Sequence, residues 1–223
     1  MLHYLGTPIT PASTYEGMCP NNFCVSFFEP RDAAWCLRNA QSIMWDNGAY
    51  SAFTLGATVI WQEYYAWLEG KLYQPHWAVV PDIIGGTVED NLKMDKKWPH
   101  PKEMSAVVYH FGEPLDRINQ ILDRGWGKLA IGGSVGSFNP GSEAWTREID
   151  SIWNTIEKCG GKPWVHMMRA HSEASLGRWP FASADSASWA RHHAEYGSDK
   201  WHKLHQITRT NPTIESNLHM ELF

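Results

Sequence analysis

The sequence predicts an α/β fold, a (β/α) barrel of the TIM type that is irregular or incomplete in places, rather than an open doubly wound sheet. Seven short apolar runs alternate with helical patterns along most of the chain, which is the order of elements in a parallel sheet. The runs are nearly continuous in apolar residues, as expected of strands covered on both faces. No G-x-G-x-x-G motif follows the first run and no G-x-x-x-x-G-K-S/T motif occurs, so a dinucleotide-binding or P-loop fold loses its main support.

The strands are predicted from short runs rich in β-branched and aromatic residues, such as FCVSFF and SAVVYHF. Most of these runs end close to a polar or turn-forming residue. The seven predicted strands cover residues 23–28, 42–46, 77–82, 105–111, 128–133, 164–170 and 180–186.

The helices are predicted from apolar residues at helical spacing and from start and stop signals. In the segment that begins at Ser142, Ile149 and Ile152 fall on one face, and Gly160-Gly161 is a stop signal. We expect one barrel domain over residues 1–223, with residues 206–223 as either a last strand or a C-terminal extension. The predicted helices cover residues 30–40, 57–73, 88–98, 114–125, 142–161 and 186–197.

Composition restricts the class of protein. The chain has 223 residues, of which 43% are hydrophobic, and a net charge of -5. These values allow a sizeable core and argue against a broad basic surface for nonspecific nucleic-acid binding. No apolar run is long enough to span a membrane and the N-terminal segment lacks the pattern of a signal peptide, so we expect no membrane partner. Four cysteines without a C-x-x-C pair indicate a reduced, cytoplasmic protein, and the oligomeric state stays open.

Polar residues gather at the C-terminal ends of the predicted strands. In a β/α barrel all of these ends open on one face, where active sites lie. A single strand-end Asp can equally be the N-cap of the next helix, but the pattern repeats on several strands, which favours one shared pocket. The residues concerned are Asp46, Asp82, His110, Glu113, Gly132, Gly133, His166, Arg169 and Asp185.

The first of these positions opens the segment W-D-N-G-A-Y-S. Asn47 and Gly48 suit a tight turn directly after Asp46, and Tyr50 and Ser51 follow at once. This spacing can place a carboxylate at a reacting bond and an aromatic ring beside a flat ligand. The alternative is an Asx-turn followed by a core tyrosine.

Two further positions suit binding and breaking a glycosidic bond. Asp82 lies between V-V-P and I-I-G-G, where a carboxylate can accept paired N–H groups from a purine-like base. The backbone N–H groups of Gly132 and Gly133 can meet a carbonyl oxygen, unless this pair is only a strand-to-loop turn. Asp185 lies among small residues that leave its carboxylate unshielded. Displacement at an anomeric carbon commonly uses two carboxylates, one for the sugar cation and one for the leaving-group proton.

Metal binding is the weaker hypothesis. His192, His193, His202 and His205 lie close together in the sequence, and H-x-x-H is a conceivable ligand pair. A solvated His-rich helix explains these residues better, because no Cys lies within 30 residues and no H-E-x-x-H motif occurs. We therefore expect no cofactor and no zinc.

Taken in order, the motifs D-N-G-A-Y-S, V-V-P-D, A-I-G-G-S-V-G, H-M-M-R-A and S-A-D-S-A-S-W resemble the tRNA-guanine transglycosylase superfamily. More specifically, they resemble its short phage-associated branch, the 7-deazaguanine DNA transglycosylases. The resemblance covers residues 23–197. It implies a barrel enzyme that exchanges guanine for a 7-deazaguanine base through a covalent glycosyl–aspartate intermediate, in the host cytoplasm if the protein is phage-encoded.

The resemblance also implies roles for individual residues. Asp185 matches the nucleophile of the family, and Asp46 matches the general acid/base. Asp82 matches the carboxylate that reads the N–H edge of the base. Four further matches concern the base. Tyr50 would stack on it, Met168 would cover it, and Gly132 and Gly133 would meet its carbonyl. His110 stands where the tRNA enzymes carry Gln.

Departures from the family pattern favour DNA over tRNA as the substrate. The tRNA enzymes follow the barrel with a zinc subdomain that has three closely spaced Cys and a His, whereas no Cys follows Cys159 here and the chain is far shorter. Arg169 stands where those enzymes usually have Gly. The expected partners are DNA, with tRNA second, and a 7-deazaguanine base. A local basic rim could be built from Arg169, Arg178 and Arg191.

A second hypothesis comes from a different class of protein. The chain can be a barrel that binds a nucleobase or nucleoside, or an N-glycoside hydrolase without base exchange. A pure binding protein does not need both Asp46 and Asp185, whereas a hydrolase needs both. The sequence therefore leaves hydrolysis open.

Overall fold

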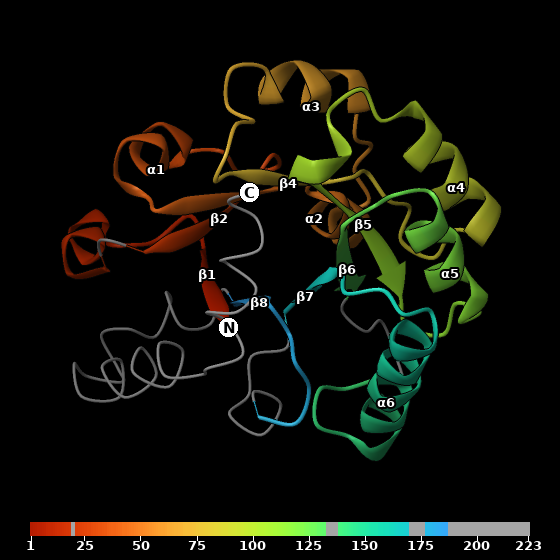
Figure 1. The fold of residues 1–223 in the computed structure, drawn as a ribbon. Coiled ribbons are helices and arrows are strands. Elements are labelled where there is room, and N and C mark those ends of the chain that lie inside the picture. The colour runs from red at the N-terminus through yellow and green to blue at the C-terminus, as the bar shows by residue number, and fades with distance from the viewer. Residues whose placement is uncertain (19–20, 133–137, 170–176, 187–223) are drawn as a thin grey trace.

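The computed structural model describes residues 1–18, 21–132, 138–169 and 177–186. Eight parallel strands close into a barrel in chain order, with β1 hydrogen-bonded to β8 (Figure 1), which confirms the predicted (β/α) barrel of the TIM type. The strands are β1 (Leu2–Gly6), β2 (Asn22–Ser26), β3 (Ser42–Asp46), β4 (Trp77–Val79), β5 (Ser105–His110), β6 (Lys128–Gly132), β7 (Trp164–Met167) and β8 (Ser183–Ser186).

The strand β1 was not among the seven predicted strands. It has only five residues, and the connection to β2 contains a 3-10 helix, η1 (Ala12–Met18), in place of an α-helix, so the alternating pattern gives no signal there. Its pairing closes the barrel, because Tyr4 lies opposite both Asn22 of β2 and Asp185 of β8. The barrel is therefore complete in its strands and irregular in its connections.

Helices surround the strands on the outside of the barrel (Figure 1). The helix predicted over residues 114–125 is shorter than expected. Residues 187–223 lie outside the described part of the chain, and they include the tail 206–223 and all of the helix predicted over 186–197 except Ser186, which ends β8. A short 3-10 helix, η2 (Lys102–Met104), precedes β5. The α-helices are α1 (Ala33–Asn39), α2 (Ala49–Leu55), α3 (Trp61–Leu68), α4 (Val88–Lys97), α5 (Asp116–Asp123) and α6 (Glu143–Lys158).

The helix α2 was not among the predicted helices, and it directly follows the tight turn expected at Asn47 and Gly48. Gly48 has φ of +77°, and a side chain there would meet the Cβ atom of Phe28 at 2.8 Å, so the tight connection between β3 and α2 requires glycine. The Asn47 side chain then accepts a hydrogen bond from the backbone N–H of Ala49 at the start of the helix. The helix predicted over residues 57–73 begins only at Trp61.

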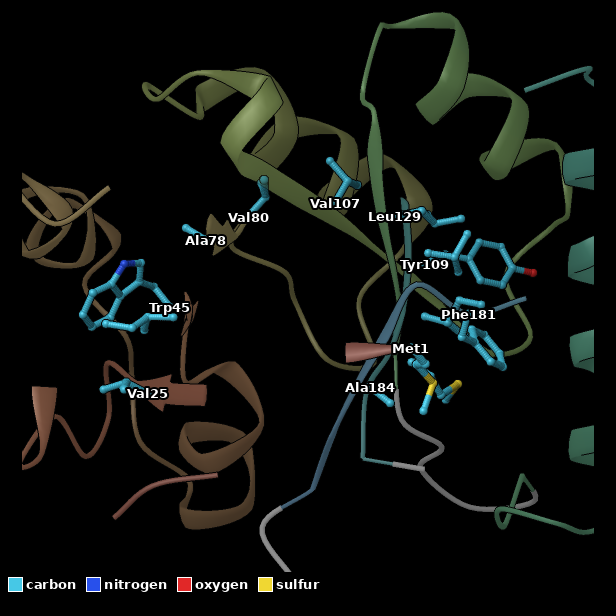
Figure 2. Close-up of a cluster of buried hydrophobic side chains, with 14 of the residues drawn as sticks. Met1, Val25, Trp45, Ala78, Val80, Val107, Tyr109, Leu129, Phe181 and Ala184 are labelled. Atoms are coloured by element: carbon cyan, nitrogen blue, oxygen red, sulfur yellow. The ribbon is translucent and has the colours of Figure 1, made fainter. Parts of the chain in front are cut away.

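Two hydrophobic clusters show which way the strand residues point. An outer cluster between strands and helices contains Ile43 and Trp45 of β3 and Val107 of β5, and Figure 2 shows part of it. An inner cluster inside the barrel contains the alternating residues Met44 and Val108. This alternation follows from the pleat of a strand, in which successive side chains point to opposite faces.

No helix in the described segments is long and apolar enough to cross a lipid bilayer.

Candidate functional site

The pleat brings polar side chains together at the C-terminal mouth of the barrel. Asp46 lies two residues after the inward-facing Met44, and His110 lies two residues after the inward-facing Val108, so both point into the mouth. In β8, Ala184 points to the outer cluster, so the next residue along the strand, Asp185, points inward. Residues from five or more strands therefore meet in one place, as the sequence predicted.

Two adjoining hollows lie at this mouth. We name the first, which is small, the Asp82 hollow, and the second, which is much larger, the Asp185 hollow. Four residues line both of them: Asp46, Tyr50, Met168 and Arg169. The Asp82 hollow is further lined by Asn47, Ala49, Asp82, Ile84, Val108, His110 and Gly132. The Asp185 hollow is further lined by Gly6, Thr7, Cys24, Ser26, Ser51, Thr54, Asp185 and Ser186.

Both carboxylate oxygens of Asp82 have hydrogen-bond partners. The Nδ2 atom of Asn47 donates to Oδ1 at 2.7 Å and also contacts the carbonyl oxygen of Val80 at 2.9 Å. The Nε2 atom of His110 lies 2.7 Å from Oδ2. Because Asp82 and Asn47 are both buried, these bonds fix the direction of the carboxylate. Each oxygen retains a second lone pair that can accept an N–H group from a ligand.

His110 carries charge because it lies between two carboxylates. Its Nδ1 atom is 3.4 Å from Glu113 Oε1, and its Nε2 atom contacts Asp82. Burial alone lowers the pKa of His110, but the hydrogen bonds and charges of Asp82 and Glu113 outweigh burial and raise the pKa to about 9. The imidazolium is then a fixed donor to Asp82 at neutral pH.

A buried asparagine links this pair to the neighbouring loop. Asn91 of α4 accepts the backbone N–H of Ile83 at 2.8 Å and lies 3.4 Å from Glu113. Pro81 has no N–H group, which ends β4 earlier than predicted and lets the chain turn out to present Asp82. Asn91 was not predicted to have a role, since a single Asn inside a helix carries no specific pattern. Glu113 was expected among the strand-end residues of the shared pocket, and it lies beside His110 without lining either hollow.

Asp185 is held differently from Asp82. Its Oδ1 atom accepts the backbone N–H of Arg169 at 2.9 Å and lies 3.2 Å from Nε2 of His166. His166 is fully buried, and its Nδ1 atom is 2.8 Å from the hydroxyl of Ser183. Among the described residues, both contacts of the Asp185 carboxylate fall on Oδ1, and Asp185 lines the Asp185 hollow.

Asp46 titrates near neutral pH. Burial raises its pKa to about 6, and the negative charges of Asp185 and Asp82 act in the same direction, whereas a hydrogen bond from Ser26 and the charge of Arg169 oppose the shift. Its Oδ2 atom accepts the backbone N–H of Gly48 at 3.1 Å. A carboxyl group with this pKa can both donate and accept a proton under physiological conditions.

The remaining predicted residues take different places. Tyr50 lines both hollows and its ring stacks on the guanidinium of Arg169, with Cζ 3.4 Å from the ring centroid. Ser51 lines only the Asp185 hollow, and Gly132 lines the Asp82 hollow. A side chain at Gly132 would meet His110 Cδ2 at 3.1 Å, so glycine keeps this wall open. Gly133, predicted to act with Gly132, lies outside the described residues.

The described residues contain no group of three His, Cys, Asp or Glu side chains placed to hold a metal ion. The histidines 192, 193, 202 and 205 lie beyond the described part of the chain, and so does Arg191. The absence of zinc therefore stays a prediction.

Comparison with protein-family models, with curated proteins and with solved structures gives no match for this chain. The inference of function therefore rests on the sequence motifs and on the geometry of the two hollows.

Proposed function

We propose that this protein is a base-exchange enzyme that replaces guanine in a nucleic acid, DNA in the first place, with a 7-deazaguanine base through a covalent glycosyl–Asp185 intermediate. One observation carries the proposal. Asp46 lines both hollows. The Asp82 hollow contains a carboxylate with hydrogen bonds on both oxygens, and the Asp185 hollow contains a carboxylate whose contacts with described residues fall on one oxygen. A glycosidic bond that joins a base to a sugar fits across this boundary.

The Asp82 hollow suits a flat base with an N–H edge. It combines apolar walls, such as Val108 and Met168, with a fixed carboxylate and a positively charged imidazole. Apolar walls with few, well-placed polar groups are typical of small-ligand sites. A guanine-like base offers paired N–H donors to Asp82, whose direction His110 helps to fix.

The Asp185 hollow suits a sugar. Beside its carboxylates it presents hydroxyl groups from Thr7, Ser26 and Ser51, which can donate to and accept from sugar oxygens. The Asp185 carboxylate lines this space, which is where C1′ would lie if the base occupied the Asp82 hollow.

The proposed reaction has two half-reactions. Asp185 Oδ2 attacks C1′, the bond from C1′ to the guanine nitrogen breaks, and the electron pair leaves with guanine, which receives a proton from Asp46. The incoming 7-deazaguanine base then gives its N–H proton to Asp46, and its nitrogen attacks C1′. The ester bond to Asp185 breaks and the enzyme returns to its starting protonation state.

The target nucleotide must be single-stranded or leave the base stack, because C1′ of a stacked nucleotide cannot reach an aspartate at the mouth of a barrel. We favour DNA over tRNA because the motifs resemble the short, DNA-modifying branch of the superfamily.

The test is an exchange assay with labelled guanine on single-stranded DNA, duplex DNA and tRNA, run side by side with the wild-type protein and with Asp185→Asn. Incorporation of label into DNA by the wild-type protein alone supports the proposal. Abasic sites without incorporation would instead identify an N-glycoside hydrolase, and binding without either product would identify a nucleobase-binding barrel. Incorporation into tRNA alone would assign the protein to RNA modification.

A further inference from the structure

Arg169 is the residue of the mouth that the proposed chemistry does not use. It follows β7 and has φ of +61°, a left-handed conformation that is uncommon for a residue with a side chain. Its backbone N–H donates to Asp185 Oδ1 at 2.9 Å, so the backbone of Arg169 and the proposed nucleophile are fixed to each other. The guanidinium therefore extends from a point next to the atom that would be attached to C1′.

The Arg169 side chain lines both hollows and is exposed to solvent. The guanidinium stacks on the ring of Tyr50, with Cζ 3.4 Å from the ring centroid. The N–H groups of a stacked guanidinium lie in its own plane, so they remain able to donate at its edges. The side chain is exposed, and no described carboxylate lies within ion-pair distance of it. With no carboxylate partner among the described residues, the guanidinium can bind a planar or tetrahedral anion.

The mouth of the barrel carries several carboxylates that would repel a nucleic acid. Asp46, Asp82 and Asp185 line the two hollows, and among the described lining residues only Arg169 is positive without proton uptake. A polyanion that approaches three carboxylates is repelled unless a positive group meets it. The second rim candidate, Arg178, is already paired with Asp150 at 2.6 Å and does not line either hollow.

We propose that Arg169 binds a backbone phosphate that flanks the target nucleotide, and so makes the enzyme act on a polymer rather than on a free nucleoside. This proposal rests on the proposed function, because it places C1′ next to Asp185. In a nucleic acid a phosphate lies on each side of the sugar, within one sugar's width of C1′, and Arg is well suited to bind phosphate with two parallel hydrogen bonds.

Binding of a single-stranded deoxyoligonucleotide with one guanine tests the proposal. Arg169→Gln should weaken binding about tenfold at moderate salt and reduce the slope of log K against log salt by about one. Arg178→Gln is the matched control. It should change the affinity and the salt slope less than Arg169→Gln does, since Asp150 already neutralises Arg178. The affinity for free guanine should stay the same in both variants.

A second probe identifies the phosphate directly. Oligonucleotides in which one neutral methylphosphonate replaces the phosphate on the 5′ or the 3′ side of the guanine should bind the wild-type protein less tightly at one of the two positions. The Arg169→Gln variant should not distinguish that oligonucleotide from the unmodified one. Equal losses in the wild-type protein and the variant would overturn the proposal, and so would an equal loss of affinity for free guanine, which would place Arg169 in base binding.

These binding measurements do not depend on turnover. If Arg169→Gln behaves as expected but no label is incorporated by the wild-type protein, the phosphate contact stands and base exchange fails. If exchange occurs and Arg169→Gln binds like the wild-type protein, exchange stands and the phosphate contact fails.

Discussion

The mouth of the barrel contains two Asp–His pairs with opposite arrangements. On the side of β4 and β5, Asp82 has both oxygens bonded, and its partner His110 lies between two carboxylates. On the side of β7 and β8, Asp185 has two contacts on a single oxygen, and its partner His166 is fully buried with a serine hydroxyl on its other side. Among the described residues, the same two residue types thus form one pair in which both carboxylate oxygens are bonded and one pair in which a single oxygen is bonded.

This difference separates binding from bond formation. A carboxylate with both oxygens fixed presents constant lone pairs, which suits recognition of N–H groups. A carboxylate with one fixed and one open oxygen is oriented by the first and can form a bond through the second. Between the two, Asp46 has a pKa of about 6, which suits transfer of a proton to and from a base. The following predictions test whether the two sides act in these different ways.

The largest effect is expected on the Asp185 side. Asp185→Asn should abolish the covalent adduct with oligonucleotide and lower exchange by about 10⁴-fold or more, since an amide oxygen is a poor nucleophile. The Asn side chain still offers an oxygen to the backbone N–H of Arg169, so the fold and the binding of oligonucleotide should persist. Adduct formation is followed by gel mobility after denaturation, and a normal amount of adduct would refute the role of Asp185.

The next effect concerns the boundary between the two sides. Asp46→Asn should lower exchange by about 10²- to 10⁴-fold, which is the usual contribution of general acid–base catalysis. In the wild-type protein, release of guanine requires protonated Asp46 and should slow as pH rises through about 6. Attack by the incoming base requires ionised Asp46 and should slow as pH falls below about 6. Single-turnover rates of the two half-reactions measure both trends, and a pH profile that Asp46→Asn leaves unchanged would exclude this assignment.

A smaller effect is expected on the Asp82 side. Asp82→Asn should weaken binding of free guanine by about 1–3 kcal/mol, because one of the two acceptor oxygens becomes a donor that faces the N–H groups of the base. Calorimetric titration with guanine measures this loss. The same variant should still form adduct with Asp185 at saturating oligonucleotide. If Asp82→Asn lost adduct formation as completely as Asp185→Asn, the two sides would not have separate roles.

The smallest effect is a stability difference that depends on pH. The pKa of His110 is raised from 6.5 to about 9 in the folded protein, so its contribution to folding is fully present below pH 6.5 and is lost as pH rises through about 9. His110→Gln should therefore lower the free energy of unfolding by about 1–3 kcal/mol at pH 6 and by less at pH 9.5. Urea denaturation at the two pH values tests this, with His76→Gln, at the opposite end of the barrel, as a control. An equal loss at both pH values would mean that His110 is not charged in the fold.

Much of the fold and of the site could be predicted from the sequence because the signals are local. Apolar runs such as SAVVYHF and the spacing of Ile149 and Ile152 depend only on neighbours along the chain. A polar residue that directly follows such a run is placed at a strand end by the same local pattern, which is why Asp46, Asp82 and Asp185 were predicted at one mouth. The strand β1 escaped prediction because no α-helix follows it to mark a β/α unit.

Only the tertiary structure decided what each of these residues contacts. His166 and Asp185 are 19 positions apart, and His110 and Asp82 are 28 apart, so no local pattern could show that they pair. The stacking of Arg169 on Tyr50 joins segments that are far apart in the chain and lie on opposite sides of the mouth. The sequence by itself determined that polar groups converge, because the pleat alternates side chains in a strand of known direction. Which carboxylate is bonded to described residues through both oxygens, and which through one, depended on barrel closure, because hydrogen bonds between strands far apart in sequence form only when the barrel sets their register.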